Sequence, residues 1–220
     1  MAIADLIALS LSWRWIPIIF SLVLLVPGCK DRPRGEVQMA SRQARHLHLV
    51  SVEEAPAGVL EALRGPIREQ FQCAVEVESG AIPIPAGSYD SARRQYRAER
   101  FLEAVKEWGA RADGKLLGVT DVDLFVPDLN FVFGQAEIGG TAAVMSIHRL
   151  RPEFYGGGAD ESALLARAAT EAVHELGHTF GLPHCSSPTC VMFFSNSILD
   201  TDRKGHRLCQ QCRARAKQVS

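Results

Sequence analysis

The sequence predicts a single domain of the α+β class, preceded by an N-terminal extension. Three observations support this fold class. The chain has 220 residues, a length that suits one compact domain with a core of its own. Segments with the period of strands alternate with segments of helical period from residue 46 onward. Residues 30–45 are polar, charged and without period, so they separate this domain from an apolar N-terminus.

The first expected elements are a strand, a helix and a second strand. Residues 46–52, His-Leu-His-Leu-Val-Ser-Val, predict the first strand. Pro56 is an acceptable first residue for a helix that runs to about Gln70. Residues 71–78 alternate apolar and polar side chains, which indicates the second strand. Two strands joined by a helix predict a right-handed βαβ unit.

The middle of the chain predicts a loop, a helix and a buried strand. Residues 82–88 are rich in proline and glycine and predict the loop. Residues 91–108 repeat apolar side chains near the helical period, so their arginines are expected on a solvent-exposed helix face rather than on a phosphate. Residues 116–126 predict a strand that runs into an acidic turn. There Asp121 and Asp123 are expected to bond backbone amides rather than to bind metal.

Two further strands and a long helix complete the order. Residues 130–134 and 141–150 predict strands on either side of a glycine-containing turn. Residues 155–158, Tyr-Gly-Gly-Gly, predict a flexible link into the helix. Asp160 is a residue type that favours the N-cap, so the helix is expected to begin near it.

The long helix carries His-Glu-Leu-Gly-His-Thr-Phe-Gly-Leu-Pro-His at residues 174–184, which has the form HExxHxxGxxH. On a helix that advances about 100° per residue, His174 and His178 lie one turn apart, so both imidazoles can reach one ion. Gly181 can take a positive φ, end the helix and return His184 as a third ligand. A buried, hydrogen-bonded side chain is the better interpretation of a lone helical histidine, but five specified residues at this spacing favour a metal site.

The donor set predicts catalytic zinc. Three neutral imidazoles leave the fourth tetrahedral position of zinc open for water, which distinguishes a catalytic site from a structural one. Glu175 follows the first ligand and points in a different direction along the helix. Its carboxylate is expected to act as the general base, taking a proton from the activated water and later passing it to the leaving amine.

Four cysteines follow the histidines in two pairs, spaced C-x₄-C and C-x₂-C. They are Cys185, Cys190, Cys209 and Cys212. Two such pairs predict a closed tetrahedral zinc site that stabilises the C-terminal segment, which would give the chain two zinc ions. Two disulfides are the alternative, and export would favour them. Cys73 lies within an expected strand and is interpreted as a small buried apolar residue.

The N-terminus predicts export. Residues 1–28 are mostly apolar, and their uncharged run is short for a membrane span of about 20 residues but suits a signal peptide. Val26-Pro27-Gly28-Cys29 also resembles a bacterial lipobox, in which Cys29 becomes the lipidated first residue. A lipoprotein anchored through Cys29, a periplasmic or extracellular protein and an uncleaved membrane anchor are the alternatives. Residues 29–45 are expected to form a polar tether.

Residues 174–192 and 209–212 together resemble the motif of the archaemetzincins, HExxHxxGxxHC-x₄-C-x-M followed by a distant CxxC. The resemblance covers roughly residues 46–215. It implies that residues 46–220 form a metzincin-like single domain, with a twisted mixed β-sheet packed with helices, an active-site helix carrying HExxH and a small C-terminal segment held by a Cys₄ zinc site.

The resemblance also implies roles for individual residues. It places His174, His178 and His184 on the catalytic zinc, Cys185, Cys190, Cys209 and Cys212 on the structural zinc, and Glu175 as general base. Met192 would form a Met-turn beneath the zinc ligands. Residues 141–147 would be the edge strand that pairs with an extended peptide substrate.

The leading hypothesis is a monomeric zinc metallopeptidase, for which the family resemblance implies aminopeptidase action on some substrates. One alternative is a zinc hydrolase of non-peptide amides. Another is a non-catalytic module in which the Cys₄ unit and C-terminal basic residues bind nucleic acid or a protein. Those basic residues are Arg203, Lys204, Arg207, Arg213, Arg215 and Lys217. A net charge of −1 and the export signal argue against nucleic acid, the intact Glu175 argues against a degenerate peptidase, and membrane contact is expected only through the N-terminus.

Overall fold

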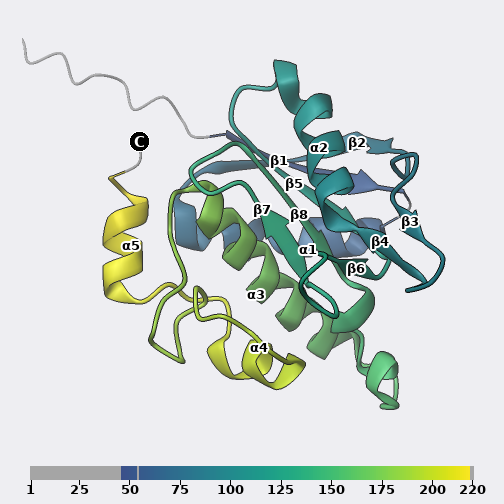
Figure 1. The fold of residues 1–220 in the computed structure, drawn as a ribbon. Coiled ribbons are helices and arrows are strands. Elements are labelled where there is room, and N and C mark those ends of the chain that lie inside the picture. Colours follow the sequence, from purple (N-terminus) through teal and green to yellow (C-terminus); the bar gives the residue numbers. More distant parts are fainter. Residues whose placement is uncertain (1–45, 54, 219–220) are drawn as a thin grey trace, which may run out of the picture. The chain divides into compact units, whose positions relative to one another are not determined.

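The computed structural model describes residues 46–53 and 55–218, which are built around a five-stranded sheet of order β2-β1-β5-β8-β7 (Figure 1). The first four strands in this order are parallel, and β7 runs antiparallel to β8. The strands are β1 (His46–Val52), β2 (Ala74–Ile82), β5 (Lys115–Thr120), β8 (Ala142–Ser146) and β7 (Gly134–Ala136). The expected leader over residues 1–28, Cys29 and the tether over 29–45 lie outside the described residues.

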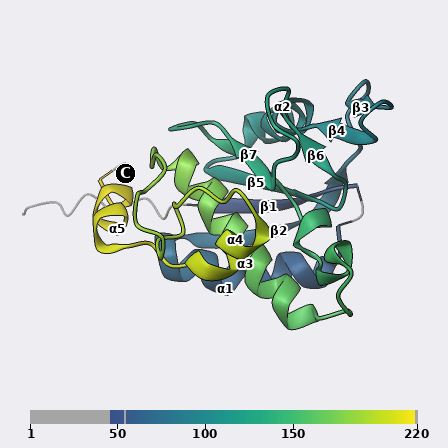
Figure 2. The ribbon, with the colours of Figure 1, turned by 60° about the horizontal axis from the view of Figure 1, so that its bottom comes forward.

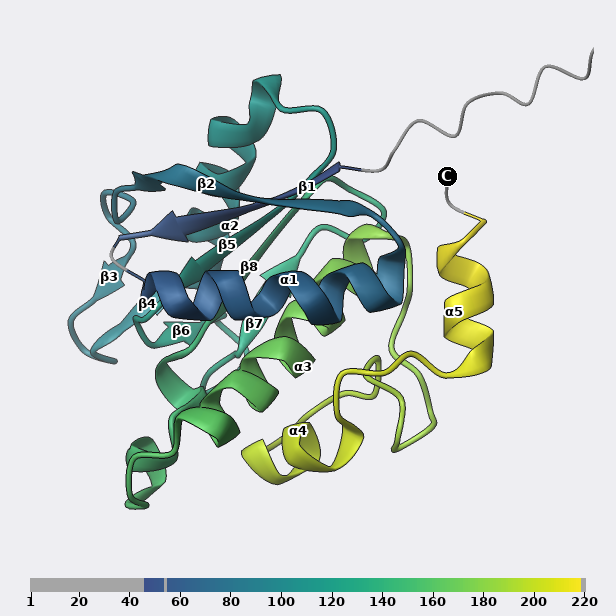
Figure 3. The ribbon, with the colours of Figure 1, turned by 180° about the vertical axis from the view of Figure 1, so that it is seen from behind.

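Helices cover both faces of this sheet (Figures 1 and 3). On one face, α1 (Ala57–Phe71) and α3 (Glu161–Thr179) pack against a core that includes Leu47 and Leu49 of β1. On the other, α2 (Ala98–Trp108) packs against a second core. In a strand that is covered on both faces, consecutive side chains are buried whichever face they point to. This explains the apolar run in β5. The predicted α+β domain with a mixed sheet and packed helices is confirmed.

The βαβ unit is formed by β1, α1 and β2, with β1 and β2 adjacent and parallel. The bounds of β1 are the predicted ones. Pro56 is the N-cap of α1 rather than its first residue. The second strand was predicted to begin at Phe71, but Phe71 ends the helix and stacks on Phe180 with a ring separation of 4.5 Å. Gln72 then takes a left-handed conformation with φ of 52°, so the strand starts only at Ala74.

The prediction of a helix over residues 91–97 is wrong. These residues belong to a short hairpin of β3 (Tyr89–Asp90) and β4 (Gln95–Arg97), and α2 begins at Ala98. The Asp90 carboxylate accepts hydrogen bonds from two following backbone amides, and Arg94 has φ of 56°. A side chain that binds the amides of the next residues stabilises a turn where a helix would otherwise start.

The predicted strand over residues 116–126 is divided. Its first part is β5, and its last part, β6 (Leu124–Phe125), joins a second sheet of order β3-β4-β6. The two acidic residues between them bind arginine side chains, so the expectation that they bond backbone amides is wrong. The ion pairs are Asp121 with Arg151 and Asp123 with Arg149. They attach the loop after β5 to the segment that follows β8.

The expected edge strand is also wrong. Residues 141–147 contain β8, which pairs with β5 on one side and β7 on the other, so β8 is internal. The edge strand of the sheet beside α3 is β7, which starts at Gly134 rather than at Asn130. All five residues of β8 are buried, whereas those of β7 are partly exposed. This difference follows from their places in the sheet.

The long helix begins as predicted. The Asp160 side chain caps α3 by accepting a hydrogen bond from the backbone amide of Ala163 at 3.0 Å. After α3 the chain forms α4 (Ile198–Lys204), which lies against α3, and α5 (Gln210–Ala216) (Figure 2). Three short 3₁₀ helices complete the described part, at Gly109–Arg111, His148–Leu150 and Pro152–Tyr155. None of the described helices is long and apolar enough to cross a membrane.

Candidate metal centre

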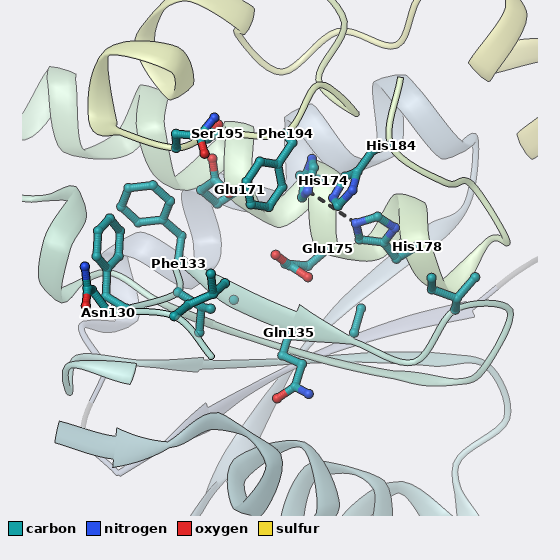
Figure 4. Close-up of a pocket in the computed structure, with 17 residues that line it drawn as sticks. Asn130, Phe133, Gln135, Glu171, His174, Glu175, His178, His184, Phe194 and Ser195 are labelled. Carbon is teal, nitrogen blue, oxygen red and sulfur yellow. Dashed lines mark hydrogen bonds between the residues drawn. The ribbon is translucent and has the colours of Figure 1, made fainter. Parts of the chain in front are cut away.

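The three motif histidines converge at the C-terminal end of α3 (Figure 4). His174 and His178 lie one turn apart, and their Nε2 atoms are 3.3 Å from each other. Gly181 has φ of 75°, so the chain reverses there and returns His184 to the other two imidazoles. The candidate ligand atoms of the three residues lie within 4.8 Å of one another. The structure thus brings together the histidines that the spacing predicts.

The positions of these rings fit a zinc ion. Zn–N bonds of about 2.0–2.1 Å in a tetrahedron put two nitrogens about 3.3 Å apart, which matches the separation of the two Nε2 atoms. The Nδ1 atom of His174 donates to the carbonyl of Val191 at 2.7 Å, and that of His178 donates to Leu182 at 2.8 Å. Because a carbonyl only accepts, the proton stays on Nδ1 and the lone pair of Nε2 remains available for a metal.

The three imidazoles are neutral near pH 7. Burial lowers the pKa of His174 well below its usual value, and the Lys204 ammonium lowers this pKa further. Burial also lowers the pKa of His178 and of His184. Neutral imidazole is the form that binds a metal ion, so burial prepares the ligands for zinc.

Glu175 points from α3 toward the edge strand β7 and lies between the imidazoles and that strand in Figure 4. A Cβ atom at Gly134 of β7 would be 2.6 Å from Cγ of Glu175 and 2.8 Å from its Cδ. Only glycine therefore allows this approach. Burial raises the pKa of the Glu175 carboxyl well above its usual value, and the charge of Glu171 raises it further. A carboxylate of raised pKa is well suited to accept a proton from water.

We expect Gly134→Ala to lower kcat/KM about 100-fold, because a shift of the catalytic group by about 1 Å costs on that order. The added methyl group would meet both Glu175 and the carbonyl oxygen of Val144. Zinc content should not change, since no zinc ligand is touched. Steady-state kinetics and metal analysis of the same preparation measure both effects. Gly80→Ala is the matched control, because a Cβ at that strand position meets nothing within 4 Å. Loss of zinc from the Gly134 variant would contradict this explanation.

Met192 packs directly against the helix that carries the histidines. Its side chain is fully buried, and a Cβ at Gly177 would lie 2.3 Å from its Sδ atom. Gly177 stands between His174 and His178 in the sequence, so the methionine contacts α3 at the level of the two ligands. Its carbonyl accepts a hydrogen bond from the amide of Cys185 at 2.9 Å. These contacts place Met192 against α3 beside the two histidines.

The four C-terminal thiols also form a cluster. Their sulfur atoms lie within 4.8 Å of one another, Cys185 and Cys209 are 4.0 Å apart, and none of the four is in a disulfide. Zn–S bonds of about 2.3 Å in a tetrahedron separate sulfurs by about 3.8 Å. The backbone amide of Cys212 lowers the pKa of Cys209 to about 7, whereas burial raises the pKa of Cys190 and of Cys212. A bound cation would stabilise the buried thiolates, so this donor set fits structural zinc.

Two buried charged residues beside the histidines were not predicted. Lys204 was expected in a basic tail, but its side chain is 0% exposed and its Nζ atom lies 3.3 Å from Oε1 of Glu171. Glu171, whose side chain is 3% exposed, stands one turn before His174 on α3. Glu171 precedes His174 by three residues, which places the two side chains on the same side of a helix. This spacing was the one sequence signal that Glu171 lies beside the histidine. No local signal marks Lys204, because its burial results from the packing of α4 on α3.

A cleft of about 400 Å³ lies between these residues and the edge strand. The histidines and Glu175 line one side of it, and β7 lines the other. Aromatic side chains extend the cleft away from Glu175. They are Phe131 and Phe133, with ring centroids 5.2 Å apart, and Phe194, which packs on His184. The cleft therefore combines the metal ligands, an acid-base group and apolar walls.

A third group of possible ligands, on β1 and β2, is explained without a metal. His48 lies near Glu76 and Glu78. Its Nδ1 atom is 2.7 Å from Glu78, and its Nε2 atom is 3.2 Å from the carbonyl of Asp113. Both ring nitrogens thus have hydrogen-bonding partners, and we assign these residues to a hydrogen-bond network.

Comparison with known proteins agrees with the geometry. Residues 73–218 match the model of Peptidase family M54. An archaemetzincin from Pyrococcus furiosus is 47% identical over 172 residues, which cover 74% of this chain and 88% of that protein. The crystal structure of an archaemetzincin from Methanopyrus kandleri has a TM-score of 0.72 and 34% identity, and covers 82% of this chain and 98% of its own. The crystal structure of a zinc-dependent peptidase from Methanocorpusculum labreanum has a TM-score of 0.71 and 33% identity. The match covers 77% of this chain and 99% of that chain.

Fold, site and relatives together define a zinc metallopeptidase. The resemblance of residues 174–192 and 209–212 to one family of these enzymes is confirmed. The chain belongs to peptidase family M54, the archaemetzincins.

Proposed function

We propose that the protein hydrolyses peptide bonds, with its catalytic zinc held by His174, His178 and His184 and with Glu175 as general base. The observation that carries this proposal is the convergence of the imidazoles in the same cleft as the Glu175 carboxylate. When bound, zinc supplies Lewis-acid chemistry, since it acidifies water and polarises a carbonyl group. The three buried, neutral imidazoles are the residues that hold it in place.

Glu175 moves the proton. Its carboxylate accepts a proton from the attacking water and delivers that proton to the nitrogen of the leaving amine. Burial raises the pKa of the Glu175 carboxyl, which helps this group to hold the proton after it leaves the water and before it reaches the amine. Gly134 allows the edge strand to approach the Glu175 side chain closely.

The edge strand β7 positions the substrate. One side of β7 pairs with β8, and its other side is the free edge of the sheet beside the cleft. An extended peptide can add to such an edge through backbone hydrogen bonds. The aromatic side chains of the cleft would then accept an apolar side chain of that peptide.

We further propose that the four clustered cysteines hold a second zinc ion, which stabilises the C-terminal segment and takes no part in hydrolysis. The cluster supports this assignment because all four sulfurs lie within 4.8 Å of one another and two of the thiols are buried.

The zinc-loaded protein is expected to cleave members of a proteome-derived peptide library, and a chelator should abolish this cleavage until zinc is restored. Mass spectrometry of the products, with the same library acetylated at its N-termini, distinguishes the two modes of attack. Products that lose one residue only from free N-termini indicate an aminopeptidase, and internal cuts indicate an endopeptidase. An intact library together with hydrolysed small amides would instead favour the non-peptide amidase.

A further inference from the structure

A buried ion pair lies directly behind the first histidine. The Lys204 ammonium, on α4, contacts Oε1 of Glu171 at 3.3 Å and the carbonyl of Phe193 at 3.2 Å. The same ammonium lies 3.3 Å from Nδ1 of His174. Glu171 also accepts a hydrogen bond from the hydroxyl of Thr201 at 2.9 Å. The pair thus connects α3, α4 and the turn after Met192 at the back of the histidine site.

The contact between Lys204 and His174 joins two donors. Nδ1 of His174 donates to Val191 at 2.7 Å, which is the shortest of its polar contacts. An ammonium group has donors only, so it cannot accept this proton. The hydrogens of Lys204 are directed instead to the two acceptors beside it, Glu171 and the carbonyl of Phe193. Of these two acceptors, only Glu171 carries a charge that balances the ammonium.

Without the Glu171 carboxylate, Nδ1 of His174 becomes a competing acceptor for the ammonium. If Lys204 donates to Nδ1, the imidazole proton moves to Nε2, and the nitrogen that faces the other two histidines loses its lone pair. An unbalanced positive charge beside the ring also opposes the binding of a divalent cation. Both effects act in the same direction and weaken metal binding.

We propose that Glu171 is a positioning residue for His174: by holding the Lys204 ammonium, it keeps the imidazole proton on Nδ1 and leaves Nε2 free for zinc. This inference rests on the proposed function, in that it takes His174 as a ligand of the catalytic ion. Glu171 also lines the cleft, but in this role it acts on Lys204 rather than on the ion or the substrate. Glu171 acts by keeping the Lys204 ammonium from donating a hydrogen bond to Nδ1 of His174.

The test compares zinc affinity at the histidine site in Glu171→Gln, Lys204→Met and the double variant. Chelator competition measures the affinity, and a His178→Ala variant identifies the zinc that is retained by the cysteines. Glu171→Gln is expected to weaken zinc binding by about 10-fold or more, the usual size of an effect from outside the ligand set. Adding Lys204→Met should restore most of the affinity, because the competing ammonium is gone. A merely structural pair would give a double variant no better than the single one.

A second measurement reads the proton directly. Nitrogen-15 NMR of the metal-free protein is expected to show His174 protonated on Nδ1 in the wild type and in Lys204→Met, and on Nε2 in Glu171→Gln. Should Glu171→Gln fail to fold, as judged by circular dichroism, Lys204→Met and the double variant still decide the matter. Both lack the ammonium, so both must keep the Nδ1 tautomer and bind zinc nearly as tightly as the wild type.

The matched control is a second ion pair between the same two helices. Arg167 of α3 donates to Asp202 of α4 at 2.7 and 2.9 Å, and Asp202 is partly exposed. Arg167→Gln should leave zinc affinity and the tautomer unchanged. The proposal is overturned if this control loses as much zinc as Glu171→Gln, or if the double variant shows no recovery. A wild-type protein that binds no zinc at the histidines would instead refute the proposed function itself.

Discussion

Replacing Glu175 with glutamine is expected to lower kcat about 10²–10⁴-fold, the usual contribution of a general base, while zinc remains bound. Glutamine has nearly the same shape, so it still fits between the histidines and Gly134, where a Cβ would already be too large. Its amide cannot accept a proton from water or return one to the leaving amine. The substitution therefore removes the proton transfer and leaves the architecture of the cleft in place.

Steady-state kinetics on a cleaved peptide and zinc analysis of the same sample measure this result. The circular dichroism spectrum and the affinity for an uncleaved peptide should match those of the wild type. Peptidase activity that persists in the glutamine variant would remove Glu175 from the mechanism. Loss of zinc would show that the carboxylate supports the ligands rather than the chemistry.

The sequence predicted the histidine site well because its geometry is local. Helical spacing places His174 and His178 on one face, and the positive φ of Gly181 returns His184 within a few residues. Strand β1 and the cap of α3 at Asp160 were predicted for the same reason, since each depends on near neighbours in the chain. These elements needed no knowledge of the tertiary fold.

The errors arose where distant segments decide the structure. Residues 91–97 have a helical pattern, but the Asp90 side chain stabilises a turn, and β4 after this turn pairs with β6 of the second sheet. Residues 141–147 were predicted to form the edge strand, but β7 is the edge strand in the structure. Strand order depends on packing between distant segments, which the local sequence does not show. Lys204 looked like part of an exposed basic tail until α4 packed on α3.

The two proposed zinc sites share backbone. His184 and Cys185 are adjacent in the chain, so each site takes one of two consecutive residues. Cys190 is likewise followed by Val191, whose carbonyl holds the Nδ1 proton of His174. Met192, next in the chain, packs under α3 at Gly177. We therefore expect a change in the cysteine cluster to affect the histidine ligands, because only one or two residues separate them.

Cys212→Ala is expected to lower the free energy of unfolding by about 3 kcal/mol, roughly one ligand's share of the about 10–16 kcal/mol that structural zinc contributes in small zinc domains. For a domain of this size that loss corresponds to a decrease in Tm of about 6–12 °C. Because the two sites share backbone, zinc affinity at the histidines should also decrease. Differential scanning calorimetry and zinc analysis of the holoprotein measure these effects.

Cys73→Ala is the matched control, because Cys73 is buried to a similar degree but lies outside the cluster. It should keep two zinc ions per chain. The same measurements separate zinc from disulfides in the wild type, since a thiol reductant destabilises a disulfide-linked segment and a chelator destabilises a zinc-bound one. A wild-type protein that holds one zinc, contains no titratable thiols in the cluster and melts earlier with reductant would contradict the Cys₄ site, and the coupling between the sites would then depend on covalent bonds.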